Sequence, residues 1–165
     1  MNDEQLTDFS EKELIRFGQL TERLAHVFYH KVPFHQLIGF NFDQITREAC
    51  RISFTKKPEL VGNFVHGILH GGVTATALDV VGGTMAAAAM LSKNLQTNDE
   101  EVGRKLAKVS TIDLRVDYLR PGRGEHFYAN ARLLRSGNKV AVVRMELHGK
   151  DDVLIALGTG TYLTG

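Results

Sequence analysis

Asp79 is the residue best placed for chemistry, because this acidic side chain stands alone in an apolar stretch. The stretch, Val73–Leu91, is built mainly from Ala, Thr, Gly and Val and is expected to be helical. Burying an unpaired carboxylate there is costly. The residue could therefore be structural, as a cap or an ion-pair partner of an arginine. Alternatively it is a nucleophile or general base whose pKa is set by its enclosure.

A second feature stands where this helix is expected to begin, the motif His70-Gly71-Gly72. Glycines allow a substrate to approach the backbone closely. The first N–H groups of a helix have no partners inside it and carry the positive end of the macrodipole. This helix start is therefore suited to stabilise an oxyanion, such as the one that forms when a thioester carbonyl is attacked.

The spacing of these two features predicts a shared site. Asp79 is seven residues beyond Gly72, so the two lie on nearly the same helix face but about 10 Å apart along the axis. A carbonyl held about 3 Å from the first amides could not be attacked by the carboxylate of the same helix. Two such helices packed antiparallel about a two-fold axis would form two composite sites. We therefore expect an obligate dimer, which could pair further into a dimer of dimers.

The elements that must position these groups follow from hydrophobic periodicity. One amphipathic helix is expected over residues 4–30, ending before Pro33, and the apolar helix near 71–91. Between them, residues 38–45 and 49–54 have the composition of strands. The polar residues 92–105, including the acidic run at 99–101, are expected to form an exposed, mobile connection.

The rest of the chain changes to the period of a strand. Four alternating segments are expected, near 112–118, 127–133, 141–147 and 153–161, and in the last the alternating set is Val153, Ile155, Leu157, Thr159 and Thr161. About six antiparallel strands and a buried helix define the α+β class. The helix covers one face of the sheet, and the N-terminal helix or another subunit must cover the other.

Composition restricts the functional classes. The 165 residues suit a single domain, and a formal net charge of +1 gives no basic field for nucleic acid. The lone Cys50 fits a reducing compartment, and the acidic N-terminus is unlike a signal peptide. Val73–Leu91 is long enough to cross a bilayer, but its small residues and Asp79 favour a helix wrapped by a sheet. We expect a cytoplasmic protein without membrane insertion.

Three segments together resemble a known family. The pattern N-x6-HGGVTATALD, the strand VSTIDLRVDYLRPG and the hairpin SGNKVAVV closely resemble the PaaI-type branch of hotdog acyl-CoA thioesterases, including its YigI-like members. The resemblance covers residues 34–163 of a single domain, 1–165, in which 1–32 is an added helical segment. It implies the hotdog fold, a sheet wrapped around a central helix. It also implies an enzyme of lipid metabolism that hydrolyses acyl-CoA to free acid and CoA without a metal or other cofactor.

The resemblance also implies roles for individual residues. Asp79 resembles the catalytic carboxylate, Gly71 the backbone oxyanion donor, and His70 the residue that shapes the turn. Asn63 resembles the residue that contacts the thioester or the attacking water, and Thr111 the Ser or Thr near that water. Asn63 lies seven residues before His70, whereas six is common among relatives. Direct attack by Asp79 and activation of water are both compatible with these roles.

Other candidates are weaker. Gly72 is grouped with the substrate-binding residues, as are Arg123 and Lys139, which stand at strand ends where the turns could meet the phosphates of a nucleotide. Surface solubility explains each of these two basic residues equally well. His66 and His70 are four residues apart, but no third ligand has suitable spacing, so no metal site is expected.

The N-terminal helix bears on the substrate. Its apolar residues could cover an acyl tunnel, which would favour medium or long fatty acyl chains, or could pack on the sheet edge; they are Phe17, Leu20, Leu24, Val27 and Phe28. Two rival functions are considered. One is a non-catalytic acyl-CoA-binding module. The other is hydration of an enoyl thioester, which calls for a His after Asp79 on the helix, and none follows.

Overall fold

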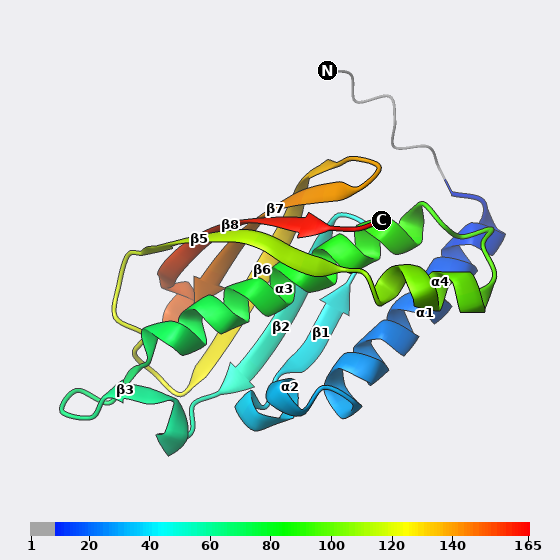
Figure 1. Cartoon of the computed structure of the whole chain (residues 1–165). Coiled ribbons are helices and arrows are strands. Elements are labelled where there is room, and N and C mark those ends of the chain that lie inside the picture. Colours follow the sequence, from blue (N-terminus) through cyan, green and yellow to red (C-terminus); the bar gives the residue numbers. More distant parts are fainter. Residues whose placement is uncertain (1–8) are drawn as a thin grey trace.

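A six-stranded antiparallel sheet and one central helix form the frame of the protein (Figure 1). The computed structural model describes residues 9–165. The strands lie in the spatial order β1 (Asn41–Ile45), β2 (Ala49–Thr55), β6 (His126–Ser136), β7 (Val140–His148), β8 (Leu154–Leu163) and β5 (Ser110–Tyr118). The central helix α3 (Gly71–Ser92) packs against all six of these strands. The predicted α+β class and hotdog arrangement are confirmed.

Helix α3 is the core of the domain rather than a membrane span. Its second half, from Thr84 to Leu91, is buried throughout, because small alanines let the sheet pack closely on one side and helices α1 and α4 cover the other. The helix is long and apolar enough to cross a bilayer, yet 72% of that apolar window is buried inside the protein. The first half is only partly covered, and it carries Asp79.

Two adjacent glycines of α3 have different surroundings. A Cβ atom at Gly82 would lie 2.7 Å from Cζ of Tyr162 and 3.1 Å from Sδ of Met145, so only glycine fits there. A Cβ atom at Gly83 would meet its nearest neighbour, a ring carbon of Tyr162, at 3.8 Å, which is ordinary contact. Close packing of helix on sheet, rather than a hinge, therefore explains Gly82.

This difference gives a matched pair of variants. We expect Gly82→Ala to destabilise the fold by about 1–3 kcal/mol, the usual result of overpacking a core. Gly83→Ala should be neutral or stabilise by up to about 1 kcal/mol, because alanine is the better helix former. Urea unfolding of both variants measures the difference. Equal free energies of unfolding would show that the contact with Tyr162 does not restrict this part of the helix.

The N-terminal helix α1 is Glu11–His30. The sequence predicts a helix from residue 4, but residues 9 and 10 are not helical, so that prediction is wrong for these two residues. Residues 1–8 lie outside the described part of the chain. The Ser10 side chain accepts a hydrogen bond from the amide of Glu13, and the Glu13 side chain accepts one from the amide of Ser10. This capping box fixes the start of the helix. Leu20 and Leu24 are buried as expected, whereas Val27 is 46% exposed. Helix α1 packs against α3 and β1. It therefore lies on the α3 side of the sheet and does not cover the opposite face.

Two further helices correct the sequence analysis. Pro33, expected only to stop α1, is the first residue of a short helix α2 (Pro33–Ile38), so the strand predicted from residue 38 begins at Asn41. Proline suits that first position because it needs no N–H partner there. The expected mobile connection contains helix α4 (Asp99–Leu106), capped by Asn98 and anchored by the buried Val102.

The remaining elements lie around the start of α3. A small hairpin, β3 (Val61–Asn63) and β4 (Ile68–Leu69), follows a 3-10 turn at Pro58–Leu60. A second 3-10 turn, Lys150–Asp152, joins β7 to β8.

The last four strands match their predicted segments to within about three residues. In β8, however, the residues on the inner face of the sheet are Ala156, Gly158, Gly160 and Tyr162. The set predicted from the sequence consists instead of the residues that alternate with these. Because glycine has no apolar side chain, this inner face cannot be recognised as the apolar one from the sequence.

Candidate active site

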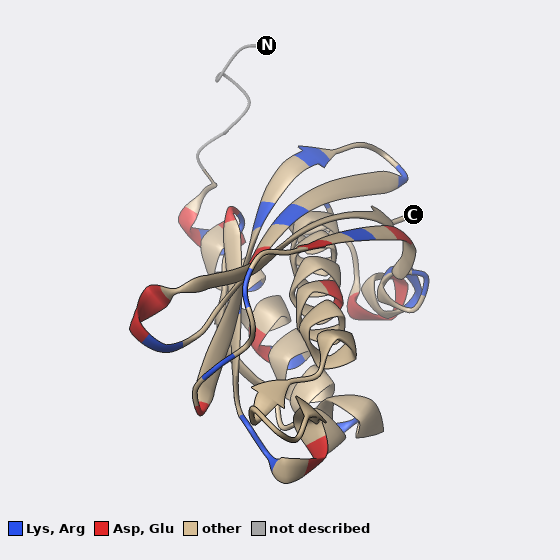
Figure 2. Cartoon of the chain, turned by 90° about the vertical axis from the view of Figure 1, so that its left-hand side faces the viewer, with Lys and Arg blue, Asp and Glu red and all other residues tan. Residues whose placement is uncertain are grey.

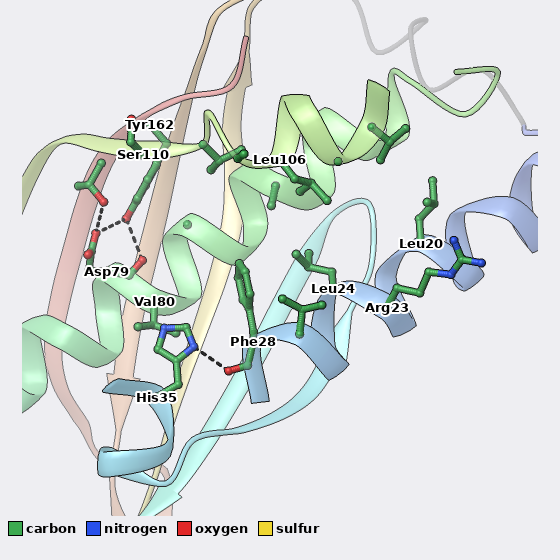
Figure 3. A pocket seen from close by; sticks show the side chains of 18 of the residues that line it. Leu20, Arg23, Leu24, Phe28, His35, Asp79, Val80, Leu106, Ser110 and Tyr162 are labelled. Carbon is green, nitrogen blue, oxygen red and sulfur yellow. Dashed lines mark hydrogen bonds between the residues drawn. The ribbon is translucent and has the colours of Figure 1, made fainter. Parts of the chain in front are cut away.

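Asp79 is half-buried on α3, and one of its two carboxylate oxygens is held by neighbouring hydroxyl groups (Figure 3). The hydroxyl of Thr111, on β5, donates a hydrogen bond of 2.9 Å to Oδ1. The hydroxyl of Tyr162, on β8, lies 3.4 Å from the same Oδ1 and 3.4 Å from the backbone oxygen of Asp79. Within residues 9–165, no hydrogen bond or ion pair is made by Oδ2. One oxygen is therefore fixed and the other is available for chemistry.

Tyr162 is a site residue that the sequence analysis missed. Its side chain is fully buried. Burial, together with the negative charge of Asp79, raises the pKa of its hydroxyl well above the ordinary value. The hydroxyl therefore stays protonated and acts as a donor. The signal that could have found it was the alternation with Gly158 and Gly160, which places Tyr162 on the inner face.

We expect Tyr162→Phe to lower kcat about tenfold, the usual effect of losing one hydrogen bond to a charged group, with KM changed by less than about twofold. The phenyl ring keeps the packing against Gly82, so the fold should be retained. The matched control is Tyr128→Phe, since Tyr128 donates instead to Asp152, away from Asp79. A rise in KM with kcat unchanged would show that Tyr162 shapes the cavity without orienting the carboxylate.

The start of α3 presents one free amide. The ring nitrogen Nδ1 of His70 accepts a hydrogen bond of 2.8 Å from the amide of Gly72, so His70 is the N-cap of the helix. The amides of Val73 and Thr74 donate to the carbonyl of His70 at 3.0 and 3.2 Å. In the described part of the chain the amide of Gly71 has no such partner. It is therefore the donor available for an oxyanion.

Tyr118 is a second residue that the sequence analysis did not assign to the site. Its hydroxyl donates a hydrogen bond of 2.9 Å to the carbonyl of Gly71. The edge strand β5 thus makes two side-chain hydrogen bonds to α3, from Thr111 to Asp79 and from Tyr118 to Gly71. Both contacts fix the position of backbone or side-chain groups with a proposed chemical role.

The candidate oxyanion donor, Gly71, and the candidate carboxylate, Asp79, do not meet within one chain. Gly71 and Asp79 belong to one unbroken helix and are eight residues apart, which is about 12 Å along the axis. Asp79 lines a cavity between α1, α3 and α4, whereas Gly72 and His70 line a different cavity beside α2. Gly71 and Asp79 are therefore as far apart in the structure as helix geometry led us to expect.

Three other candidates lie apart from Asp79. The side-chain oxygen of Asn63 accepts hydrogen bonds of 3.1 and 3.2 Å from the amides of Val65 and His66, so it shapes the tip of the β3–β4 hairpin. Arg123 and Lys139 are exposed and lie at opposite ends of β6, an 11-residue strand about 35 Å long. They could not bind the same phosphate group on one chain. Figure 2 shows that the Lys and Arg residues are spread over strands, helices and turns rather than gathered in one patch.

Residues 9–165 offer neither a thiolate nucleophile nor a cluster of metal ligands. Burial raises the pKa of the Cys50 thiol, on β2, to about 12, so it is not a thiolate nucleophile at neutral pH. Among residues 9–165, no group of three or more His, Cys, Asp or Glu side chains could hold a metal ion.

An apolar cavity of about 570 Å³ extends from Asp79 along α3, a size typical of small-molecule sites. Helices α1 and α4 form its walls (Figure 3). Of the five apolar residues considered for an acyl tunnel, Leu20, Leu24, Val27 and Phe28 line this cavity, whereas Phe17 packs in the core instead. The carboxylate thus stands at one end of a space suited to a hydrocarbon chain.

Comparison with known proteins agrees with this arrangement. A family model described as "Thioesterase superfamily" matches residues 66–156. The medium/long-chain acyl-CoA thioesterase YigI of Escherichia coli K12 is 42% identical over 147 residues, which is 89% of this chain and 95% of YigI.

Solved structures give the same result. A Shewanella oneidensis protein described as related to the thioesterase superfamily superposes with a TM-score of 0.87 at 46% identity, covering 90% of this chain and 97% of its own. The PaaI protein of E. coli has a TM-score of 0.73 at 16% identity, covering 90% and 96%, which shows a common fold.

The fold and the lone carboxylate on its central helix define a hotdog protein of the thioesterase class. More particularly, the extent of the family match and the similarity to YigI show that this chain belongs to the thioesterase superfamily.

Proposed function

We propose that this chain hydrolyses medium- to long-chain acyl-CoA thioesters to free acid and CoA. The observation that carries the proposal is the carboxylate of Asp79, which has one oxygen held by Thr111 and the other free at the end of an apolar cavity. The activity named for the relative from E. coli supports the same substrate class. The single Cys50, buried and not part of a disulfide, favours a reducing, cytoplasmic location.

The chemistry follows from two groups. The amide of Gly71 donates to the carbonyl oxygen and stabilises the negative charge that develops there. Asp79 either attacks the carbonyl carbon, giving an anhydride that water then opens, or takes a proton from the attacking water. In both routes the C–S bond breaks and CoA leaves as a thiol after gaining a proton. Neither route requires a metal or redox cofactor.

The proposed active unit is a homodimer with two shared sites. The 12 Å separation, about eight residues of helix, prevents Gly71 and Asp79 of one α3 from acting on the same carbonyl. Two surfaces support pairing: the partly covered first half of α3 and the edge strand β5, on which Ile112 is 57% exposed. An unpaired edge strand is a template for another chain. Such dimers could associate further into a dimer of dimers.

The test is thiol release from a series of acyl-CoAs, from butanoyl to hexadecanoyl, measured with a thiol-reactive dye. We expect kcat/KM to rise with chain length into the medium and long range, because each methylene buried contributes about 0.8 kcal/mol. The melting temperature with each acyl-CoA is measured in parallel. Stabilisation by acyl-CoA without thiol release would instead indicate a non-catalytic binding module.

A further inference from the structure

Charged residues line the end of the cavity opposite Asp79. Figure 3 shows Arg23 and Leu20 of α1 at that end. Asp99, the first residue of α4, accepts a hydrogen bond of 2.5 Å from Arg23 through Oδ2 and another from Arg16 through Oδ1. These two guanidinium groups lower the pKa of Asp99, so the carboxylate is charged at neutral pH. We call these three residues, Arg16, Arg23 and Asp99, the Asp99 clamp.

The Asp99 clamp is a prominent polar link between the two walls of the cavity. Both Arg23 and Asp99 line the cavity, and the remaining wall residues of α1 and α4 are mostly apolar. Helix α4 is short, and Val102 is its buried residue. A charged contact that a longer ligand could reach therefore joins α4 to α1, in addition to the apolar anchor Val102.

One face of α3 gives a scale for the length of the cavity beyond the reacting carbon. Asp79, Gly83 and Ala87 all line the cavity and are spaced by four residues. They are thus stacked along the helix at intervals of about 6 Å, or about 12 Å in all. An extended hydrocarbon chain advances about 1.25 Å per carbon, given bonds of about 1.5 Å that meet near 111°. A chain of about ten carbons therefore spans this face.

We propose that the Asp99 clamp sets the upper limit of the acyl chain that this site accepts, with Ala87 marking the last methylenes that are enclosed. The proposal rests on the acyl-CoA hydrolysis proposed above and names the residues that select among its substrates. A chain that ends before the clamp gains burial from every methylene, about fourfold in affinity each. A longer chain must leave the cavity into water or part Asp99 from its arginines, so further methylenes add little.

The first experiment measures KM against acyl-CoA length from hexanoyl to hexadecanoyl. In the natural protein we expect log KM to fall steadily and then become level near decanoyl to dodecanoyl. Asp99→Asn removes the charge that holds both arginines, so the level region should begin at longer chains. The ratio of kcat/KM for hexadecanoyl-CoA to that for decanoyl-CoA should rise several-fold, about fourfold for each methylene newly enclosed.

The matched control is Glu100→Gln. Glu100 is the next residue of α4 and shares its acidic first turn, but its side chain is 82% exposed and pairs with Arg104. Glu100→Gln removes the same charge from the N-terminus of α4 as Asp99→Asn does, without changing the Asp99 clamp. We expect this variant to keep the natural length profile. If it shifts the profile as much as Asp99→Asn does, the limit depends on the stability of α4 and the clamp proposal is overturned.

The opposite change fills the cavity. Ala87→Leu places a larger side chain about 12 Å from Asp79, and the level region of log KM should then begin about two carbons earlier. If that variant does not fold, Gly103→Leu on α4 replaces it, because a Cβ atom at Gly103 meets nothing within 4 Å and Gly103 lines the same cavity. An unchanged profile in the folded variant would show that the acyl chain lies elsewhere.

These outcomes separate the two proposals. If the natural protein releases no thiol from any acyl-CoA, the proposed function fails. If it is active but the level region is absent, or is the same in Asp99→Asn and in the natural protein, the hydrolase stands and the clamp proposal fails.

Discussion

Asp79→Asn is expected to lower kcat for acyl-CoA hydrolysis about 10³-fold, within the range lost when a general base is removed. The substitution is close to ideal in shape, because asparagine keeps an oxygen that can accept from both Thr111 and Tyr162. The amide nitrogen replaces the other oxygen, the one that is free in the structure. The change therefore removes the reactive atom and leaves its supports in place.

Thiol release under saturating acyl-CoA measures this effect, and the melting temperature shows whether the fold is retained. Thr111→Ala is the matched control: it keeps both carboxylate oxygens and removes one donor, so a smaller loss of about tenfold is expected. If Asp79→Asn retained more than a tenth of the natural kcat, Asp79 would be a structural residue and the proposed chemistry would be wrong.

The sequence predicts the sheet and the central helix well because their signals are strong and local. In β7 the alternating apolar residues of the predicted segment 141–147, which are Ala141, Val143, Met145 and Leu147, are all fully buried. The position of α3 follows from a long run of small apolar residues. Helix geometry then fixes the distance between Gly71 and Asp79 without any tertiary information.

The elements that the sequence analysis missed have their signals at their ends rather than in their periodicity. Helix α4 has Asn98 as its cap, three acidic residues in its first turn, and Arg104 and Lys105 in its last. Such a pattern suits the helix dipole, but a single buried residue gives almost no apolar stripe. The run of acidic residues therefore looks like a loop when the search is for hydrophobic spacing.

The site was predicted only in part for a similar reason. The lone carboxylate on an apolar helix can be found from one segment of sequence. Its contacts with Thr111 and Tyr162 join three segments far apart in the chain. Such contacts depend on the register of β5 and β8, and Gly160 made the inner face of β8 look like its outer face. The Asp99 clamp is likewise formed by two helices that sequence periodicity does not place side by side.

Gly71→Pro is expected to lower kcat by about 10²–10³-fold, the usual loss when one oxyanion donor is removed. Proline deletes the free amide and little else, since it is well accepted at the first position of a helix. The preceding residue, His70, already has φ −63° and ψ 136°, a conformation compatible with a following proline. A Cβ atom at Gly71 would lie 3.4 Å from a ring carbon of Tyr118, an ordinary contact.

Gly71→Ala is the control, because alanine adds the same Cβ atom but keeps the N–H group. We expect it to retain most of the natural kcat. If alanine and proline were equally damaging, the loss would come from crowding against Tyr118 rather than from the missing donor.

The two inactive variants together test how the site is built. Consider a dimer of one Asp79→Asn chain and one Gly71→Pro chain, isolated through two different affinity tags. If each site takes its amide from one chain and its carboxylate from the other, one site joins the intact Gly71 of the first chain to the intact Asp79 of the second. The other site has neither group. Such a mixed dimer should therefore recover about half of the natural activity per dimer, although both parent dimers are inactive. If each site belonged to a single chain, every site in the mixed dimer would lack one group, and activity would stay at the level of the parents.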